Sequence, residues 1–191
     1  YVTGVNYATW NGDINGGGVD DTAPLHPYSS DDGDEEIVVL KLDTAGAYQW
    51  HTFYGSGCSD FGDGIAVTGD AVYVTGTGNC SWNGGDADTL PLHPHSGGYD
   101  ICVLKLATSG AYQWHTFYGS TTTKQDKGHG IAVTGDAVFV TGESYGWNGD
   151  GDTTPLHPYS GGYDICVLKL ATSGTYQWHT FYGNAGSTYP D

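Results

Sequence analysis

The segment at residues 97–119 reads GGYDICVLKLATSGAYQWHTFYG and decides the fold of this 191-residue chain. It recurs at residues 161–183 with one change, Thr175 in place of Ala111, and a more divergent copy covers residues 36–55. Each copy holds two runs rich in β-branched and aromatic residues around a short polar loop that ends in glycine, which predicts a β-hairpin. The first run, Ile101 to Leu106, hardly alternates, so we expect a strand that is buried on both faces.

A second predicted hairpin precedes the two later copies, at residues 64–76 and 130–142, where apolar runs flank Thr-Gly-Asp-Ala. Tyr48, Tyr112 and Tyr176 recur at a constant spacing, which indicates a repeat architecture. We therefore expect an all-β chain of about three tandem units, each with four antiparallel strands, and essentially no α-helix. The units are residues 1–55, which lack the first strand, residues 56–119, and residues 120–191 with a C-terminal tail.

Four motifs together resemble the SBBP (seven-bladed β-propeller) repeat of secreted and cell-surface bacterial proteins. They are GIAV at 64–67, VYVTG at 72–76, YDICVLKL at 99–106 and SGAYQWHTFYG at 109–119. The resemblance covers almost all of the chain and implies propeller-like blades, although about three units is fewer than the usual four to eight. The turn at Thr68 to Ala71 is shorter than is usual in the family, and the loop before each copy of the stretch is long and acidic. The family implies no catalytic residues.

The net charge is −17, with five lysines and no arginine. A nucleic-acid-binding protein needs a basic surface, so this composition excludes that class and disfavours an anionic membrane. No apolar run is long enough to span a membrane. An acidic chain rich in glycine and tyrosine is typical of extracellular or cell-surface proteins, and this is the expected location.

A stack of repeat units leaves its two outermost faces uncovered, and exposed apolar faces mark interaction sites. Because the chain begins within one unit and ends where a further strand is due, we expect head-to-tail self-association, with strand donation as one mechanism. The alternative is that the chain is an excerpt of a longer propeller. The residues expected to make the contact lie in the terminal strands: Tyr1, Val2, Tyr7, Tyr176, Trp178 and Phe181.

Acidic loops are the candidate metal sites, because Ca²⁺ binds several oxygen ligands in flexible loops. The carboxylates chosen are Asp86, Asp88, Asp150 and Asp152. No EF-hand or other calcium motif is present, and we favour solvated acidic turns over a calcium site. Two further sets, His26, His93 and His157, and His51, His115 and His179, repeat with the units, and we interpret them as packing residues and not as metal ligands.

Cys58 and Cys80 flank the hairpin at residues 64–76. If Val67 pairs with Val72, these cysteines lie almost opposite each other, so we predict a disulfide and an oxidising compartment. Cys102 and Cys166 occupy the position of Val38 and are expected to be small buried residues with free thiols.

Trp10, Trp82 and Trp147 recur in the loops before the copies of the stretch. Sugars stack on aromatic rings beside acidic and amide groups, which makes these residues glycan-stacking candidates. We favour the alternative that each tryptophan fills a gap between units.

The sequence shows no catalytic motif, and its notable residues come in twos and threes, so we expect a non-enzymatic protein. The first hypothesis is an extracellular structural protein that self-assembles into a surface fibre or filament. The alternative is a carbohydrate-binding, adhesin-like propeller, with calcium as a candidate cofactor.

Overall fold

β-branched and aromatic residues fill the strands, and the computed structural model, which describes residues 1–13, 22–29, 33–85 and 89–185, folds them into three antiparallel sheets. The first sheet contains β1 (Val2–Asn6), β2 (Glu36–Leu42) and β3 (Tyr48–Tyr54). The second contains β4 (Asp60–Val67), β5 (Ala71–Gly78), β6 (Asp100–Ala107) and β7 (Tyr112–Tyr118). The third contains β8 (Lys127–Thr134), β9 (Ala137–Ser144), β10 (Asp164–Ala171) and β11 (Tyr176–Tyr182).

The all-β prediction is confirmed, since the described residues contain strands, loops and one 3-10 turn, η1 (Asp150–Asp152), but no α-helix. Every sheet is an antiparallel meander in chain order, with three strands in the first sheet and four in each of the others. The two hairpins expected in the second unit are the pairs β4–β5 and β6–β7, and β5 joins them by pairing with β6.

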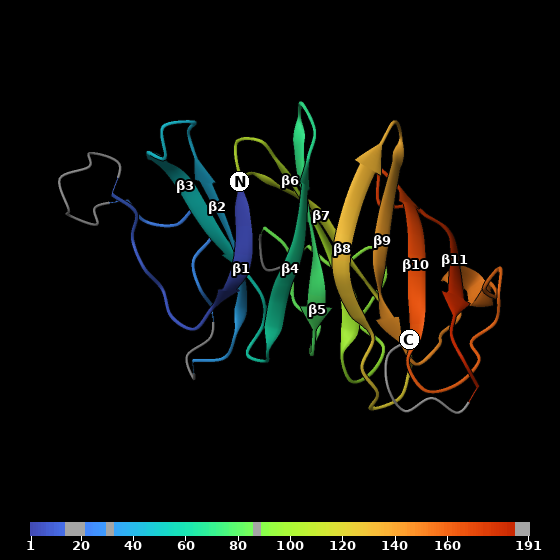
Figure 1. Cartoon of the computed structure of the whole chain (residues 1–191). Coiled ribbons are helices and arrows are strands. Elements are labelled where there is room, and N and C mark those ends of the chain that lie inside the picture. The colour runs from blue at the N-terminus through green and yellow to red at the C-terminus, as the bar shows by residue number, and fades with distance from the viewer. Residues whose placement is uncertain (14–21, 30–32, 86–88, 186–191) are drawn as a thin grey trace.

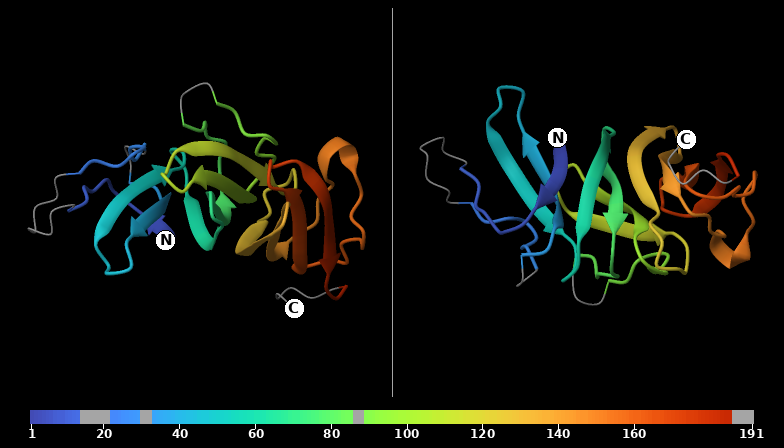
Figure 2. Two further views of the ribbon diagram at one scale, coloured as in Figure 1. Left: turned by 90° about the horizontal axis from the view of Figure 1, so that it is seen from above. Right: turned by 60° about the horizontal axis from the view of Figure 1, so that its bottom comes forward.

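The three sheets follow one another in a row, in chain order, and do not close on themselves (Figures 1 and 2). β4 packs on β1 and β2 of the preceding sheet, and β8 packs on β4, β5 and β6. The strand that begins each complete sheet therefore lies against the sheet before it. This arrangement gives the second sheet a neighbour on both faces and each outer sheet a neighbour on only one.

Apolar residues gather in two clusters, one in each space between neighbouring sheets. Ile37, Val39 and Tyr54 of the first sheet meet Val74 and Leu104 of the second. The second cluster repeats this arrangement one unit later, with Ile101, Val103, Tyr118, Val140 and Leu168 in the corresponding places. Alternate residues of β6 therefore enter different cores, which explains why its sequence shows almost no alternation.

A β-bulge in β4 changes the pairing register in the second sheet. The residue numbers of paired residues sum to 139 between Val67 and Gly64, and to 138 between Gly62 and Asp60, because Asp63 is left out of the ladder. The bulge brings β4 and β5 close together: a Cβ on Gly76 would fall 1.7 Å from the carbonyl oxygen of Phe61. Glycine is therefore required at this position, and Gly142 meets the Lys127 carbonyl in the same way.

Candidate functional site

One set of three side chains recurs in every sheet: a loop tryptophan, and a histidine and a tyrosine from the last strand. The indole stacks on the imidazole with ring centroids 3.7, 3.8 and 3.9 Å apart in the first, second and third sheets. The tyrosine hydroxyl lies 2.7–2.8 Å from histidine Nδ1, and histidine Nε2 lies 2.9–3.0 Å from the tryptophan main-chain oxygen. The sets are Trp10–His51–Tyr48, Trp82–His115–Tyr112 and Trp147–His179–Tyr176.

These contacts fix the charge state of the histidines. A carbonyl oxygen only accepts, so Nε2 carries the proton and Nδ1 accepts the tyrosine hydroxyl. Burial lowers the pKa of His51 and His179, and lowers the pKa of His115 to about 4. Both nitrogens of each neutral ring are occupied by the protein itself, so these histidines act as packing and hydrogen-bonding residues.

The Pro-Leu-His-Pro motif covers the outer edge of the last strand in each sheet. Its leucine N–H donates to the strand histidine carbonyl at 2.9 Å, and the strand phenylalanine N–H donates to the motif histidine carbonyl at 3.1–3.2 Å. The motif histidine donates from Nδ1 to the phenylalanine carbonyl at 2.7–2.8 Å and stacks on the next tyrosine. The histidines are His26, His93 and His157. They therefore close an edge that would otherwise expose unpaired backbone groups.

The structure corrects the glycan-stacking interpretation of two tryptophans. Trp82 is 4% exposed and Trp147 is 7% exposed, and each lies between a strand histidine and a phenylalanine, Phe117 or Phe181. A sugar needs one open face of an indole, and burial between these rings removes it. Trp10 is half-buried and stacks on His51, so a part of its surface stays open.

An open groove of about 1150 Å³ lies between loops of the second and third units. His93, Asn148, Asp152 and Tyr159 are among its lining residues. At its rim, the Tyr118 hydroxyl donates to Asp150 Oδ1 at 3.0 Å, and His93 Nε2 lies 3.9 Å from the same carboxylate oxygen. The groove therefore combines aromatic rings with polar groups of both donor and acceptor type.

The calcium candidates fall in different parts of the chain. Asp150 and Asp152 lie one residue apart in η1 and are both exposed, whereas Asp86 and Asp88 lie outside the described residues. Within the described part of the chain, no three His, Cys, Asp or Glu side chains are grouped as metal ligands.

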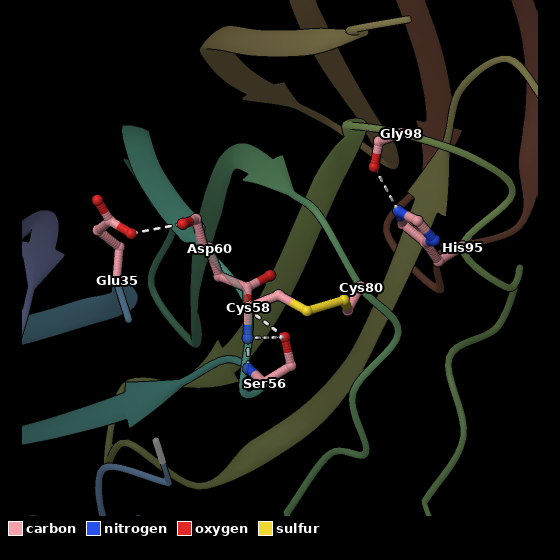
Figure 3. Close-up of a disulfide and its surroundings, with 8 residues drawn as sticks. Glu35, Ser56, Cys58, Asp60, Cys80, His95 and Gly98 are labelled. Atoms are coloured by element: carbon pink, nitrogen blue, oxygen red, sulfur yellow. Dashed lines mark hydrogen bonds between the residues drawn. A yellow bond between two sulfur atoms is a disulfide. The ribbon is translucent and has the colours of Figure 1, made fainter. Parts of the chain in front are cut away.

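Cys58 and Cys80 form a disulfide with their Cα atoms 5.9 Å apart (Figure 3). Their residue numbers sum to 138, the register that the β4 bulge sets, so the bulge places them opposite each other. Ser56 lies beside the bridge, where its hydroxyl accepts the Cys58 N–H at 3.2 Å and donates to Asp60 Oδ2 at 2.9 Å. Cys102 and Cys166 are buried free thiols, and burial raises the pKa of both.

Buried carboxyl groups at the two junctions between sheets were missed by the sequence reasoning. Glu36 and Asp60 both border Gly55, and Asp100 and Asp126 both border Gly119. Burial raises the pKa of Asp60 to about 7, and the charge of Glu36 adds to the increase. Burial also raises the pKa of Asp100, which faces Asp126. These groups could not be found from the sequence, because the members of a pair lie far apart in the chain and meet only when the sheets pack.

Several residues of the terminal strands already make contacts within the chain. Tyr1 already donates to the Thr108 carbonyl at 3.1 Å, and Tyr176 packs on Tyr118 of the second sheet. Phe181 is fully buried, and the Pro-Leu-His-Pro motif covers the edge of β11. Tyr1 and Tyr176 therefore already make contacts within the chain, and Phe181 has no open surface for a contact with another copy.

Other apolar side chains, on the open faces of the two outer sheets, are exposed or half-buried. The leading face of the first sheet, which points away from the second sheet, carries the exposed Val2 (53%) and Leu42 (36%) and the half-buried Val38 and Leu40. The trailing face of the third sheet, which points away from the second sheet, carries the exposed Ile165 (45%) and Tyr182 (56%) and the half-buried Val167 and Trp178. Tyr7 is also exposed, at 61%. Of the residues expected at a contact, Val2 and Tyr7 are exposed, Tyr1, Tyr176 and Trp178 are half-buried, and Phe181 is buried. The repeat spacing could have identified the exposed residues that were not expected, such as Ile165 and Tyr182, because it assigns each of them a buried counterpart.

The sequence matches no protein-family model, and no curated protein matches it. Among the described residues, no helix is long and apolar enough to cross a membrane.

Proposed function

We propose that this chain is a non-enzymatic structural protein of propeller-like blades that self-associates head to tail, outside the cell, into a surface fibre or filament. Each complete sheet supports the blade interpretation, since it is a four-stranded meander whose first strand packs on the preceding sheet. The disulfide supports an oxidising compartment.

One observation carries the proposal: the two outer faces expose residues whose counterparts are buried inside the chain. Ile165 and Tyr182 are 45% and 56% exposed, while Ile101 and Tyr118 are 0% and 1% exposed. On the leading face, Val2 is 53% exposed and its counterpart Val74 is 0% exposed. Each internal junction joins a trailing face to a leading face, so the two open faces are complementary in kind. Contacts between unlike faces form a ring when the rotation closes and a filament when it does not.

A repeated structural role also favours a non-enzymatic protein. The histidines and tyrosines that could perform acid–base chemistry occur once in every sheet and hydrogen-bond to the fold itself. An active site is normally a single constellation of residues, whereas these sets serve each unit alike.

The size of the native particle tests the proposal. We would combine light scattering with negative-stain microscopy over a range of concentrations, and compare wild type with Ile165→Asp. Val67→Asp is the matched control, because Val67 is 46% exposed but lies at the hairpin end of β4. Long particles of uniform width that are lost only in Ile165→Asp would support the proposal. A wild-type chain that stays monomeric at high concentration would contradict it.

A carbohydrate-binding role is the second candidate, and the groove beside Asp152 and Tyr159 is the observation that favours it. Asp152 and Asn148 supply polar groups for sugar hydroxyls, and Asp150 and Asp152 are the remaining calcium candidates. Glycan-array binding of the monomeric Ile165→Asp protein, with and without calcium, would test this role. Binding that is lost in Asn148→Ala together with Asp152→Ala would support it, and an unchanged array signal would exclude the groove.

A further inference from the structure

The turn between the last two strands of each later sheet rests on the preceding sheet. A Cβ on Gly110 would fall 2.3 Å from Leu25 Cδ1, and a Cβ on Gly174 would fall 2.3 Å from Leu92 Cδ1. These distances show that the leucine of the Pro-Leu-His-Pro motif lies directly on the turn of the following sheet. The same contact is therefore made at both internal junctions.

A lysine adds a polar contact to each of these junctions. Lys41 Nζ donates to the Thr108 carbonyl at 3.1 Å, and Lys105 Nζ donates to the Thr172 carbonyl at 2.9 Å. At the second junction, Trp114 Nε1 also donates to the Thr172 carbonyl, at 3.3 Å. In each case, the ammonium group lies over an aromatic ring: Lys41 Nζ is 5.4 Å from the Tyr1 ring centroid and Lys105 Nζ is 5.1 Å from that of Tyr73.

The third sheet holds the same groups in the same arrangement, although no further turn of the described chain rests on them. Lys169 Nζ lies 5.4 Å from the Phe139 ring centroid. Trp178 meets Phe139 at 6.2 Å and 63°, compared with 6.3 Å and 64° for Trp114 and Tyr73. Leu156 is 71% exposed, compared with 56% for Leu92. The receiving half of a junction is therefore already formed.

The first sheet holds the matching turn, residues 43–47. Gly46 has φ of +85°, close to the +90° of Gly110 and the +88° of Gly174. Its N–H donates to the Asp43 carbonyl at 3.1 Å, as the Gly110 N–H donates to the Ala107 carbonyl at 2.9 Å. Nothing lies within 4 Å of a Cβ placed on Gly46, so this turn is uncovered in the described chain.

We propose that the turn at residues 43–47 of a second copy of this chain docks on Leu156, Lys169 and Trp178 of the third sheet. In this junction, Lys169 Nζ donates to the Thr44 carbonyl of the other copy, and Leu156 covers its Gly46. This inference rests on the proposed head-to-tail association and defines its register. Because both halves have their bound conformation before they meet, little conformational entropy is lost on docking.

One local pair of opposite charges favours this register. Asp43 stands where the internal turns have Ala107 and Ala171, so the exposed turn carries a carboxylate beside the carbonyl that Lys169 would reach. The internal junctions lack this carboxylate. A lysine and an aspartate brought together across an interface help to select the partner and its orientation.

Paired cysteines test the register directly. Leu25 and Ala111 line one groove at the first internal junction, and Leu156 and Ala47 are their counterparts. We expect Leu156→Cys with Ala47→Cys to form covalent chains under mild oxidation, in a concentration-dependent manner. Leu25→Cys with Ala111→Cys is the control and should crosslink within one chain without a change in mass.

A second measurement separates this inference from the proposed function. Leu156→Asp should weaken self-association at least tenfold in sedimentation experiments. At a concentration at which both proteins are monomeric, its melting temperature should equal that of wild type, because Leu156 is exposed. If wild type associates but Leu156→Asp associates equally well and the paired cysteines give only monomers, this register is wrong although self-association stands. A monomeric wild type would overturn both.

Discussion

The second and third sheets share almost the same last hairpin, residues 97–119 and 161–183, yet the two hairpins differ in burial. Ile101 is 0% exposed and Ile165 is 45% exposed, and Tyr118 and Tyr182 are 1% and 56% exposed. The backbone pairing is equivalent in the two hairpins, including a register shift after Lys105 and after Lys169. The difference therefore arises from the neighbours: the second sheet has one on each face and the third on one.

This comparison shows that one sequence can be core in one copy and exposed surface in the next. Matched substitutions in the two hairpins measure how much stability the neighbouring sheet supplies. They are most informative at concentrations at which the chain is monomeric.

The largest effect is expected from shortening the buried isoleucine. Ile101→Ala should lower the free energy of unfolding by about 2–5 kcal/mol, because it removes buried methyl groups and leaves a cavity. Ile165→Ala should lower it by less than about 1 kcal/mol, since nearly half of that side chain is already in water. Urea denaturation of both variants measures the difference. Equal losses would show that the third sheet is covered in solution.

The next largest effect is expected from the disulfide, which the second sheet has and the third sheet lacks. Cys58→Ala with Cys80→Ala should destabilise the chain by about 3 kcal/mol, because the bridge closes a loop with a sequence separation of 22 residues. Thermal unfolding with and without reductant measures the effect, and reductant should not alter the double variant. Thiol titration of the denatured, unreduced wild type should find two free thiols, and four would mean that the bridge is absent.

Acid should unfold the chain through its buried histidines. The pKa of His115 is lowered to about 4 in the folded state. As the pH falls below 6.5, the unfolded chain therefore binds a proton at this residue that the folded chain does not bind. Stability is therefore lost between pH 6.5 and about 4, by up to about 3 kcal/mol for His115. The pKa of His179 is lowered for the same reason. Nitrogen NMR at pH 6 should show the His115 ring neutral with the proton on Nε2, and a charged His115 ring would contradict these hydrogen bonds.

The smallest effect is expected at the tyrosine that ends each hairpin. Tyr118→Phe should cost about 1 kcal/mol, because it removes the hydrogen bond from the Tyr118 hydroxyl to Asp150. Tyr182→Phe should change stability by less than about 0.5 kcal/mol, since its side chain is largely in water. Melting temperatures of the two variants would resolve the difference, and a larger loss at Tyr182 would reverse the comparison.

The sequence by itself determined the strands and their order. Hairpins are specified locally, by the short loops that end in Gly110 and Gly174 and by the apolar runs on either side. The hairpins could therefore be predicted without knowing which sheet packs against them. The repeat spacing determined the number of sheets. The pairing of Val67 with Val72 placed Cys58 near Cys80 to within one residue, and only the bulge at Asp63 was missing from that prediction.

The tertiary structure decided what each repeated residue does. Burial depends on which sheet lies opposite, and identical residues such as Ile101 and Ile165 contain no information about that sheet. The same reason explains why Trp82 and Trp147 lie in the interior and why the edge of β11 is closed by residues 155–158. Local sequence specifies hydrogen bonding along a strand, whereas the hydrophobic contacts that separate core from surface form only when the sheets stack.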